Sequence, residues 1–229
     1  WNGLSYYDGY SFHTFRDEPD GVSVLSTNRI LNIQPTAANN VWCITQDHKL
    51  YLYDTHLCQF LKTSNQINEK FKVDFRADNI YDINGGNTWV TSANADYLLR
   101  TNDTDVLDFE LIHVGQKGLK SGKVYFIYGD KKHREWILTD KGTTIYGKKF
   151  STNVPYKWIR EVGEYVFLAT ENGKVIVVDE KNRATNVPLP EGITHINELK
   201  NTGYQLLLAT NLGVVIYNPR TFKSEIINI

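Results

Sequence analysis

Methionine is absent from the 229 residues, and cysteine occurs only twice, as Cys43 and Cys58. Because the chain begins at Trp1 and has no methionine, we expect a processed or excised piece, whose lack of a targeting segment says nothing about its compartment. Cys43 falls on the predicted second strand of a blade and Cys58 near the start of the fourth, and strands two apart are separated by roughly 9–10 Å. A disulfide requires Cα atoms within about 7 Å, so we predict two unpaired thiols, buried or half-buried.

Long apolar runs and an excess of charge of either sign are also missing. No segment approaches the roughly 20 apolar residues of a membrane-spanning helix. The net charge of −1 provides no general attraction to nucleic acid or to an anionic membrane. The tight basic cluster Lys131–Arg134 lies between two predicted strands, so we interpret it as a solvated hairpin tip. No helical periodicity of useful length is visible, and the β-branched and aromatic composition favours strands.

Motifs of catalysis and metal binding are missing as well. The chain has no Gly-x-Ser-x-Gly turn, no phosphate-binding loop and no dinucleotide fingerprint. The histidines are scattered, and chance explains the pair His48 and His56 better than a metal site does. Asn102–Asp105 begins like a calcium loop but lacks the Gly and Glu that would follow, so we expect an ordinary turn. We therefore predict a non-enzymatic segment with no catalytic residue, no metal and no cofactor.

What the chain does contain is a repeated unit. It is clearest over Glu135–Gly147, where an apolar strand ending in threonine is followed by a glycine-containing turn and a second strand. It returns over Phe167–Asp179 and Leu207–Asn218, with looser copies over Val41–Asp54 and Thr88–Arg100. The strand-ending hydroxyl residues are separated by 47, 47, 31 and 40 residues, and they are Thr45, Ser92, Thr139, Thr170 and Thr210. A period near 40 residues built from short strands is typical of β-propeller blades.

The repeat predicts an all-β chain that forms part of a β-propeller, with about five four-stranded blades and half of another. We expect a single domain over residues 1–229, with a half blade at 1–15 and blades at about 29–63, 79–114, 123–151, 157–189 and 194–227. Residues 64–78 are polar and are expected to form an irregular connection, and Asn84–Asn87 a tight hairpin turn. Trp42, Trp89 and Trp136 recur at one blade position, so we place them in the core.

Three segments resemble a known repeat. Residues 3–8 read Gly-Leu-Ser-Tyr-Tyr-Asp, residues 23–33 contain Ser-Val-Leu-Ser-Thr-Asn-Arg-Ile, and residues 41–45 read Val-Trp-Cys-Ile-Thr. These are similar to the two-component regulator propeller repeat, although the similarity is strong only over Trp1–Asp54. The resemblance implies a segment of a larger, seven-bladed ring in the periplasmic sensor of a hybrid two-component histidine kinase, an inner-membrane protein of polysaccharide degraders. It also implies an oligosaccharide ligand, further blades and a β-sandwich of the parent protein, and homodimerisation. From the net charge we expect no nucleic-acid partner.

In a propeller, the turns that join second and third strands gather on one face with the links between blades. Polar groups there suit sugar hydroxyls. Trp158, with Arg160 on the same side of its strand, would add a stacking surface unless it packs in the core. The candidate ligand-binding residues are His48, Asp140, Lys141, Trp158, Arg160, Glu171, Asn172 and Asn211.

Two alternative functions remain open from the sequence. A carbohydrate-active propeller enzyme, such as a glycosidase or lyase, is the first. A glycosidase would need two carboxylates about 5–10 Å apart in a cleft, and Asp47, Asp140 and Glu171 each follow a second strand and could project from one face. A protein-binding scaffold of the same shape is the second alternative.

Overall fold

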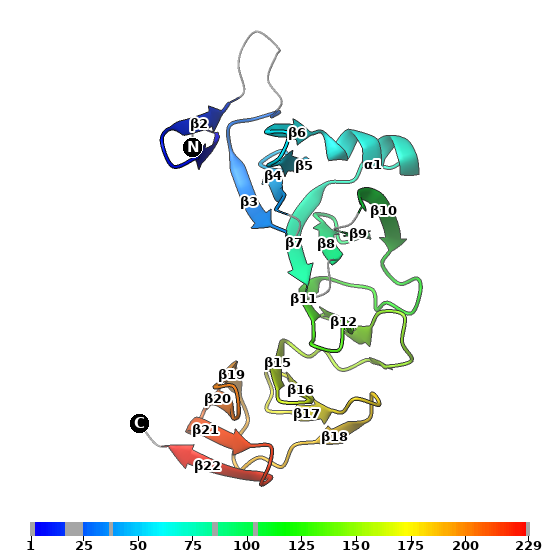
Figure 1. Ribbon diagram of the computed structural model, residues 1–229. Helices are drawn as coiled ribbons and strands as arrows, with labels where there is room; N and C mark the ends of the chain where they lie inside the picture. The colour runs from blue at the N-terminus through cyan, green and yellow to red at the C-terminus, as the bar shows by residue number, and fades with distance from the viewer. Residues whose placement is uncertain (1–2, 17–24, 37–38, 84–86, 103–104, 228–229) are drawn as a thin grey trace. The chain divides into compact units, whose positions relative to one another are not determined.

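The computed structural model describes residues 3–16, 25–36, 39–83, 87–102 and 105–227. The chain forms two compact units, Trp1–Val114 and Gly115–Ile229. In both, each strand pairs antiparallel with its neighbour in sequence, so the sheets are simple meanders (Figure 1).

The first unit holds one two-stranded and two four-stranded sheets among its described residues. The strands are β1 (Leu4–Tyr7) and β2 (Phe12–Phe15); β3 (Ile30–Pro35), β4 (Val41–Thr45), β5 (Leu50–Asp54) and β6 (Gln59–Leu61); and β7 (Ala77–Ile83), β8 (Asn87–Ser92), β9 (Tyr97–Asn102) and β10 (Asp105–His113).

The second unit holds three four-stranded sheets. Their strands are β11 (Val124–Gly129), β12 (Glu135–Thr139), β13 (Gly142–Ile145) and β14 (Ser151–Thr152); β15 (Trp158–Val162), β16 (Tyr165–Ala169), β17 (Val175–Val178) and β18 (Ala184–Asn186); and β19 (Ile196–Asn201), β20 (Leu206–Thr210), β21 (Gly213–Asn218) and β22 (Lys223–Ile227).

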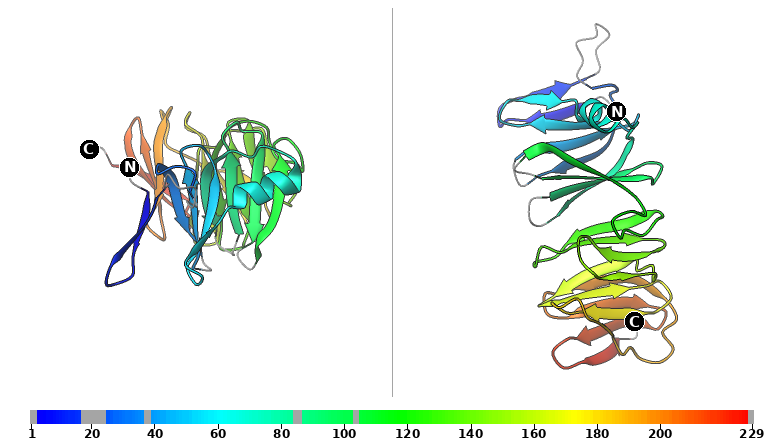
Figure 2. Two further views of the ribbon diagram at one scale, coloured as in Figure 1. Left: turned by 90° about the horizontal axis from the view of Figure 1, so that it is seen from above. Right: turned by 90° about the vertical axis from the view of Figure 1, so that its right-hand side faces the viewer.

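Within each unit the sheets pack face to face, which confirms the predicted all-β fold class of propeller blades (Figure 2). The second strand of a blade is buried on both faces. In β16, Phe167 and Ala169 pack toward β19–β22, while Val166 and Leu168 pack toward β11–β14. The continuous apolar run of such a strand therefore follows from having a sheet on either side. Trp42, Trp89 and Trp136 are fully buried, as predicted.

The two-stranded sheet β1–β2 corresponds to the third and fourth strands of a blade. Gly3 immediately precedes β1, and a Cβ added there would collide with the carbonyl oxygen of Phe15 on β2. Gly142 opens β13, a third strand, and a Cβ there would collide in the same way with the carbonyl of Thr152 on β14. Both glycines have positive φ. β1 and β2 thus approach each other at Gly3 as closely as the third and fourth strands of a complete blade, β13 and β14, do at Gly142.

A short helix was missed by the sequence analysis. Residues Thr63–Phe71 form α1, within the segment that we expected to be irregular. Ile67 is fully buried against the β3–β10 core and Phe71 packs beside it, while most other helix residues are polar. Two apolar residues give too weak a periodic signal over nine residues. The helix ends at Lys72, whose left-handed backbone donates its N–H to the carbonyl of Asn68.

In the basic cluster Lys131–Arg134, the first three residues are exposed, as predicted for a solvated hairpin tip, but Arg134 is buried. The prediction was therefore wrong for Arg134. Arg134 is 5% exposed, and its Nε donates to Oδ2 of the fully buried Asp130 at 2.6 Å. The same carboxylate oxygen accepts from Nε1 of Trp136 at 2.8 Å. Arg134 Nη1 reaches the carbonyl of Asp179, at the end of β17 in the next blade, at 2.7 Å. The guanidinium is buried because it connects two blades.

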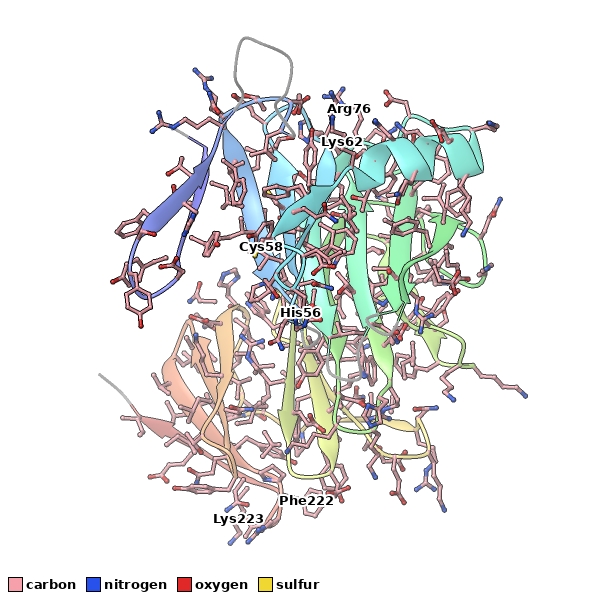
Figure 3. All side chains as sticks on the ribbon, turned by 45° about the horizontal axis from the view of Figure 1, so that its top comes forward. His56, Cys58, Lys62, Arg76, Phe222 and Lys223 are labelled. Carbon is pink, nitrogen blue, oxygen red and sulfur yellow. The ribbon has the colours of Figure 1, made fainter. Side chains whose placement is uncertain are left out.

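The two cysteines are both free, as predicted, but they differ in environment. Cys43 is buried in β4, and burial raises the pKa of its thiol to about 12. Cys58 was expected to be at least half-buried, and that prediction was wrong. It is exposed in the β5–β6 turn, where it has a positive φ (Figure 3).

Two further predictions fall partly outside the described residues. The turn predicted over Asn84–Asn87 includes residues 84–86, and the turn over Asn102–Asp105 includes residues 103 and 104. In the part of the chain that the structure describes, no helix has the length and apolarity to cross a membrane.

Thr139→Val should lower the free energy of unfolding by about 1–3 kcal/mol, because it removes a buried hydroxyl that both donates and accepts a hydrogen bond. Urea denaturation measures this difference. Thr185→Val, on an exposed position of β18, is the control and should change stability little. Equal losses in the two variants would contradict the proposed importance of the Thr139 hydroxyl.

A thiol-reactive dye at pH 8 should label one cysteine in the folded chain and two in denaturant. Cys58 is exposed, whereas Cys43 is inaccessible and has a pKa of about 12, so it carries almost no thiolate at this pH. The Cys58→Ser variant should show no fast labelling. Fast labelling in that variant would mean that β4 is not buried as described.

Candidate functional site

The strand-ending hydroxyl closes the turn between the second and third strands of a blade. Thr139 Oγ1 donates to the carbonyl of Gly142 and accepts from the amide of Lys141. Thr210 makes the equivalent bonds with Gly213 and Leu212. A hydroxyl can donate and accept at once, which explains why this position carries Thr or Ser throughout the repeat.

In the β3–β6 blade the strand-ending hydroxyl, that of Thr45, is hydrogen-bonded to a carboxylate of the same turn. Thr45 Oγ1 donates to Oδ1 of Asp47 at 2.6 Å, and Ser26 Oγ donates to the same oxygen at 2.9 Å. Burial alone would raise the pKa of Asp47, but these hydroxyl bonds and the nearby Lys49 ammonium outweigh it and hold the pKa below its usual range. The Asp47 carboxylate is therefore occupied within its own turn.

The turn of one blade also binds the backbone of the next blade. The amide of Ala77, which begins β7, donates to the carbonyl of His48 in the β4–β5 turn. The amide of Ile196, which begins β19, donates to the carbonyl of Glu171 in the β16–β17 turn. These bonds place the second-to-third turn beside the link that enters the following blade.

A groove of about 730 Å³ lies in the second unit around the β16–β17 turn. It is bounded by that turn, by the links that enter β15 and β19, and by β11. Its lining residues are Tyr125, Val154, Pro155, Lys157, Thr170, Glu171, Asn172, Lys174, Thr194 and His195.

The groove lining combines polar side chains with an exposed aromatic ring. Lys157 Nζ lies 3.3 Å from Oε1 of Glu171. Thr170 Oγ1 donates to Oδ1 of Asn172 at 2.6 Å, which leaves the Asn172 amide NH₂ as a donor. Tyr125 is 40% exposed. It is the extra residue of a β-bulge, because Val124 and Phe126 pair with the consecutive residues Thr139 and Leu138. A bulge re-aims a side chain, here toward the groove.

Of the eight residues proposed from the sequence, Glu171 and Asn172 line this groove. Asn211 does not line the groove, but its side chain binds the backbone of the link that enters β19. Its Oδ1 accepts from the amides of Thr194 at 2.9 Å and His195 at 3.1 Å, and its Nδ2 donates to the carbonyl of Gly192. Asn211 is therefore a positioning residue for the link that carries Thr194 and His195.

The other candidates in the second unit are not groove-lining residues. Trp158 is partly buried against the β15–β22 core, and the Lys157 ammonium lies 5.1 Å from its ring centre. Arg160 Nη1 is bonded to the carbonyl of Ile159. Asp140 and Lys141 form the β12–β13 turn and face one another, with Nζ 3.8 Å from Oδ2.

His48 lies in the first unit. Its Nδ1 is 2.8 Å from the carbonyl oxygen of Ala77, and because a carbonyl only accepts, Nδ1 is the donor. The backbone of His48 has a positive φ of 64°. Its side chain and its main chain both bind β7, so His48 joins two blades.

Sequence reasoning did not propose the other eight lining residues, which are Tyr125, Val154, Pro155, Lys157, Thr170, Lys174, Thr194 and His195. One signal could have found two of them, since Lys157 and His195 stand immediately before a first strand. The bulge at Tyr125 has no such signal in the sequence. Among the described residues, no group of three or more His, Cys, Asp and Glu side chains could hold a metal ion.

No family model matches the chain, and no curated protein sequence matches it. Solved structures match it in fold. The extracellular domain of BT4673 from B. thetaiotaomicron, described as a hybrid two-component system, superposes with a TM-score of 0.56 at 16% identity, over 99% of this chain and 34% of that one. The extracellular domain of BT3049, of the same description and organism, gives 0.55 at 15% identity, over 87% and 28%.

Virginiamycin B lyase from Staphylococcus aureus also matches, with a TM-score of 0.54 at 12% identity, over 87% of this chain and 70% of that one. Identities this low show a shared fold alone. The chain thus has the fold of β-propeller blades and spans about a third of the length of the two-component structures that it matches. Extracellular domains of hybrid two-component systems are thus among the structures that share this fold.

Asn211→Ala should speed hydrogen exchange at the amides of Thr194 and His195, because both lose their acceptor. Asn211→Asp keeps an acceptor oxygen and should leave both amides protected, while losing the bond to the Gly192 carbonyl. Nuclear magnetic resonance can measure both amides. Unchanged exchange in Asn211→Ala would contradict the positioning role.

Proposed function

We propose that this chain is an extracytoplasmic, ligand-sensing propeller segment of a hybrid two-component sensor histidine kinase and response regulator. In this proposal it belongs to the periplasmic part of an inner-membrane protein, and its ligand is an oligosaccharide released by polysaccharide breakdown. The fold similarity to extracellular domains of hybrid two-component systems supports the class. The lead-in and strand motifs over Trp1–Asp54 support it independently.

The observation that carries the ligand proposal is the groove around the β16–β17 turn. An exposed aromatic ring beside convergent hydrogen-bond donors suits a sugar, which offers an apolar ring face and a rim of hydroxyls. Tyr125 supplies the ring, and Asn172, Thr194 and Lys174 supply polar groups. Its volume of about 730 Å³ lies within the usual range of small-molecule sites, about 300–1,000 Å³.

A sensor needs no reactive residue. A ligand shifts a kinase equilibrium by as much as its affinities for the two states differ. In this proposal the parent protein contributes further blades, a β-sandwich and a second copy, and the groove supplies the differential contact. The two-carboxylate arrangement of a glycosidase is not favoured by the groove. Glu171 there is paired with Lys157, and Asp140 is not among the lining residues.

Calorimetric titration of the chain with a panel of oligosaccharides tests the proposal. We expect saturable binding of at least one, weakened up to about tenfold by Tyr125→Ala, because stacking on an aromatic ring contributes about 0.5–1.5 kcal/mol. Tyr204→Ala is the matched control, since Tyr204 is 63% exposed in the β19–β20 turn, outside the groove. Equal effects of the two substitutions, or no binding of any oligosaccharide, would contradict the proposal.

A further inference from the structure

A basic residue stands immediately before the first strand of every described four-stranded blade. The five are Arg29, Arg76, Lys123, Lys157 and His195. Their main chains occupy equivalent places. The carbonyls of Arg29, Arg76, Lys123 and His195 each accept from the residue that follows the strand-ending hydroxyl, and Lys157 donates to the carbonyl of Ala169. The backbone alone makes these bonds, so the blade geometry does not explain why the side chain is basic each time.

Two of these residues meet in one groove in the second unit. Lys157 and His195 both line the groove around the β16–β17 turn, together with Lys174. Among the described lining residues, Glu171 carries the single carboxylate, and it is paired with Lys157 at 3.3 Å. Cationic groups therefore outnumber anionic groups in the groove.

Lys174, unlike Lys157, is not paired with Glu171 and is therefore available to a ligand. Lys174 is exposed and makes no ion pair with any residue that the structure describes. The His195 side chain makes no hydrogen bond within the described part of the chain, and it is held in place by the Asn211 bonds to its backbone. Asn172 adds an amide NH₂, because its oxygen already accepts from Thr170. Lys174 and Asn172 thus offer donors that no carboxylate of the groove occupies, which suits a ligand that carries acceptors and negative charge.

We infer that the groove selects an anionic oligosaccharide, one that carries a carboxylate or a sulfate on a sugar ring. This inference rests on the proposed function and names its ligand class. Lys174 and His195 bind the anionic group, Asn172 binds a neighbouring oxygen, and the Tyr125 ring packs against the sugar face. Lys157 is held by Glu171 and contributes positive potential rather than a direct contact.

Two matched pairs of ligands separate charge from sugar shape. The first pair is trigalacturonate and its methyl ester, and the second is a sulfated galactose disaccharide and its desulfated counterpart. Calorimetry at low and high salt gives the affinity of the 229-residue chain for each. We expect at least one charged member to bind more tightly than its neutral counterpart, with an advantage that shrinks as salt screens the groove. The preferred charged member distinguishes carboxylate from sulfate.

Lys174→Gln tests the residue directly. It should weaken binding of the charged ligand about three- to tenfold and leave the neutral ligand unchanged, because it removes a charge-assisted contact at an exposed site. Lys223→Gln is the matched control and should have no effect, since Lys223 begins β22 (labelled in Figure 3) and is not among the residues that line the groove. Thermal melts of both variants establish that each is folded.

The outcomes distinguish this inference from the proposed function. If the neutral ligands bind as tightly as the charged ones and Tyr125→Ala weakens them, the inference is overturned and the oligosaccharide proposal stands. If Lys174→Gln and Lys223→Gln lower the affinity equally, the assigned contact is wrong and the inference fails. If no ligand of either pair, nor any of the wider panel, binds, both proposals fail.

Discussion

The hydrogen bond of the strand-ending hydroxyl is the contact on which the candidate site depends. It closes the turn between the second and third strands in the second unit: Thr139 and Thr210 donate to a third-strand carbonyl, and Thr170 accepts from the amide of Lys174. The closed turn then presents a carbonyl to the first strand of the next blade, as Glu171 does to Ile196. Two backbone segments far apart in sequence are thereby brought side by side, and their side chains form the walls of the groove.

The fold was largely predictable because its cause is periodic. Second strands are apolar on both faces, they end in Thr or Ser, and a turn follows, so the sequence shows the blade positions directly. The features that were missed depend on tertiary contacts. Two apolar residues of α1 are buried only because the β3–β10 core receives them, and Arg134 is buried only because Asp179 of another blade accepts its hydrogen bond.

The candidate site was predictable to a lesser degree. Glu171 and Asn172 were found because they occupy a turn that the repeat marks. Asn211 was found for the same reason, yet its amide is used to hold the Thr194–His195 backbone. Tyr125 was not found because a bulge, which depends on the pairing of β11 with β12, decides where its ring lies. The sequence predicts which residues occupy a turn, because the turn follows a recognisable strand end. It does not predict where a bulge residue such as Tyr125 points, because that depends on how two strands pair.

Hydrogen exchange at three turn amides tests the central claim most directly. The amides of Lys141, Lys174 and Leu212 each donate to a strand-ending threonine hydroxyl, although all three residues are exposed. The account predicts that all three exchange much more slowly than the amide of Tyr204, in the exposed β19–β20 turn. Exchange of the three at the rate of Tyr204 would contradict it, because the hydroxyls would then not close the turns that form the groove.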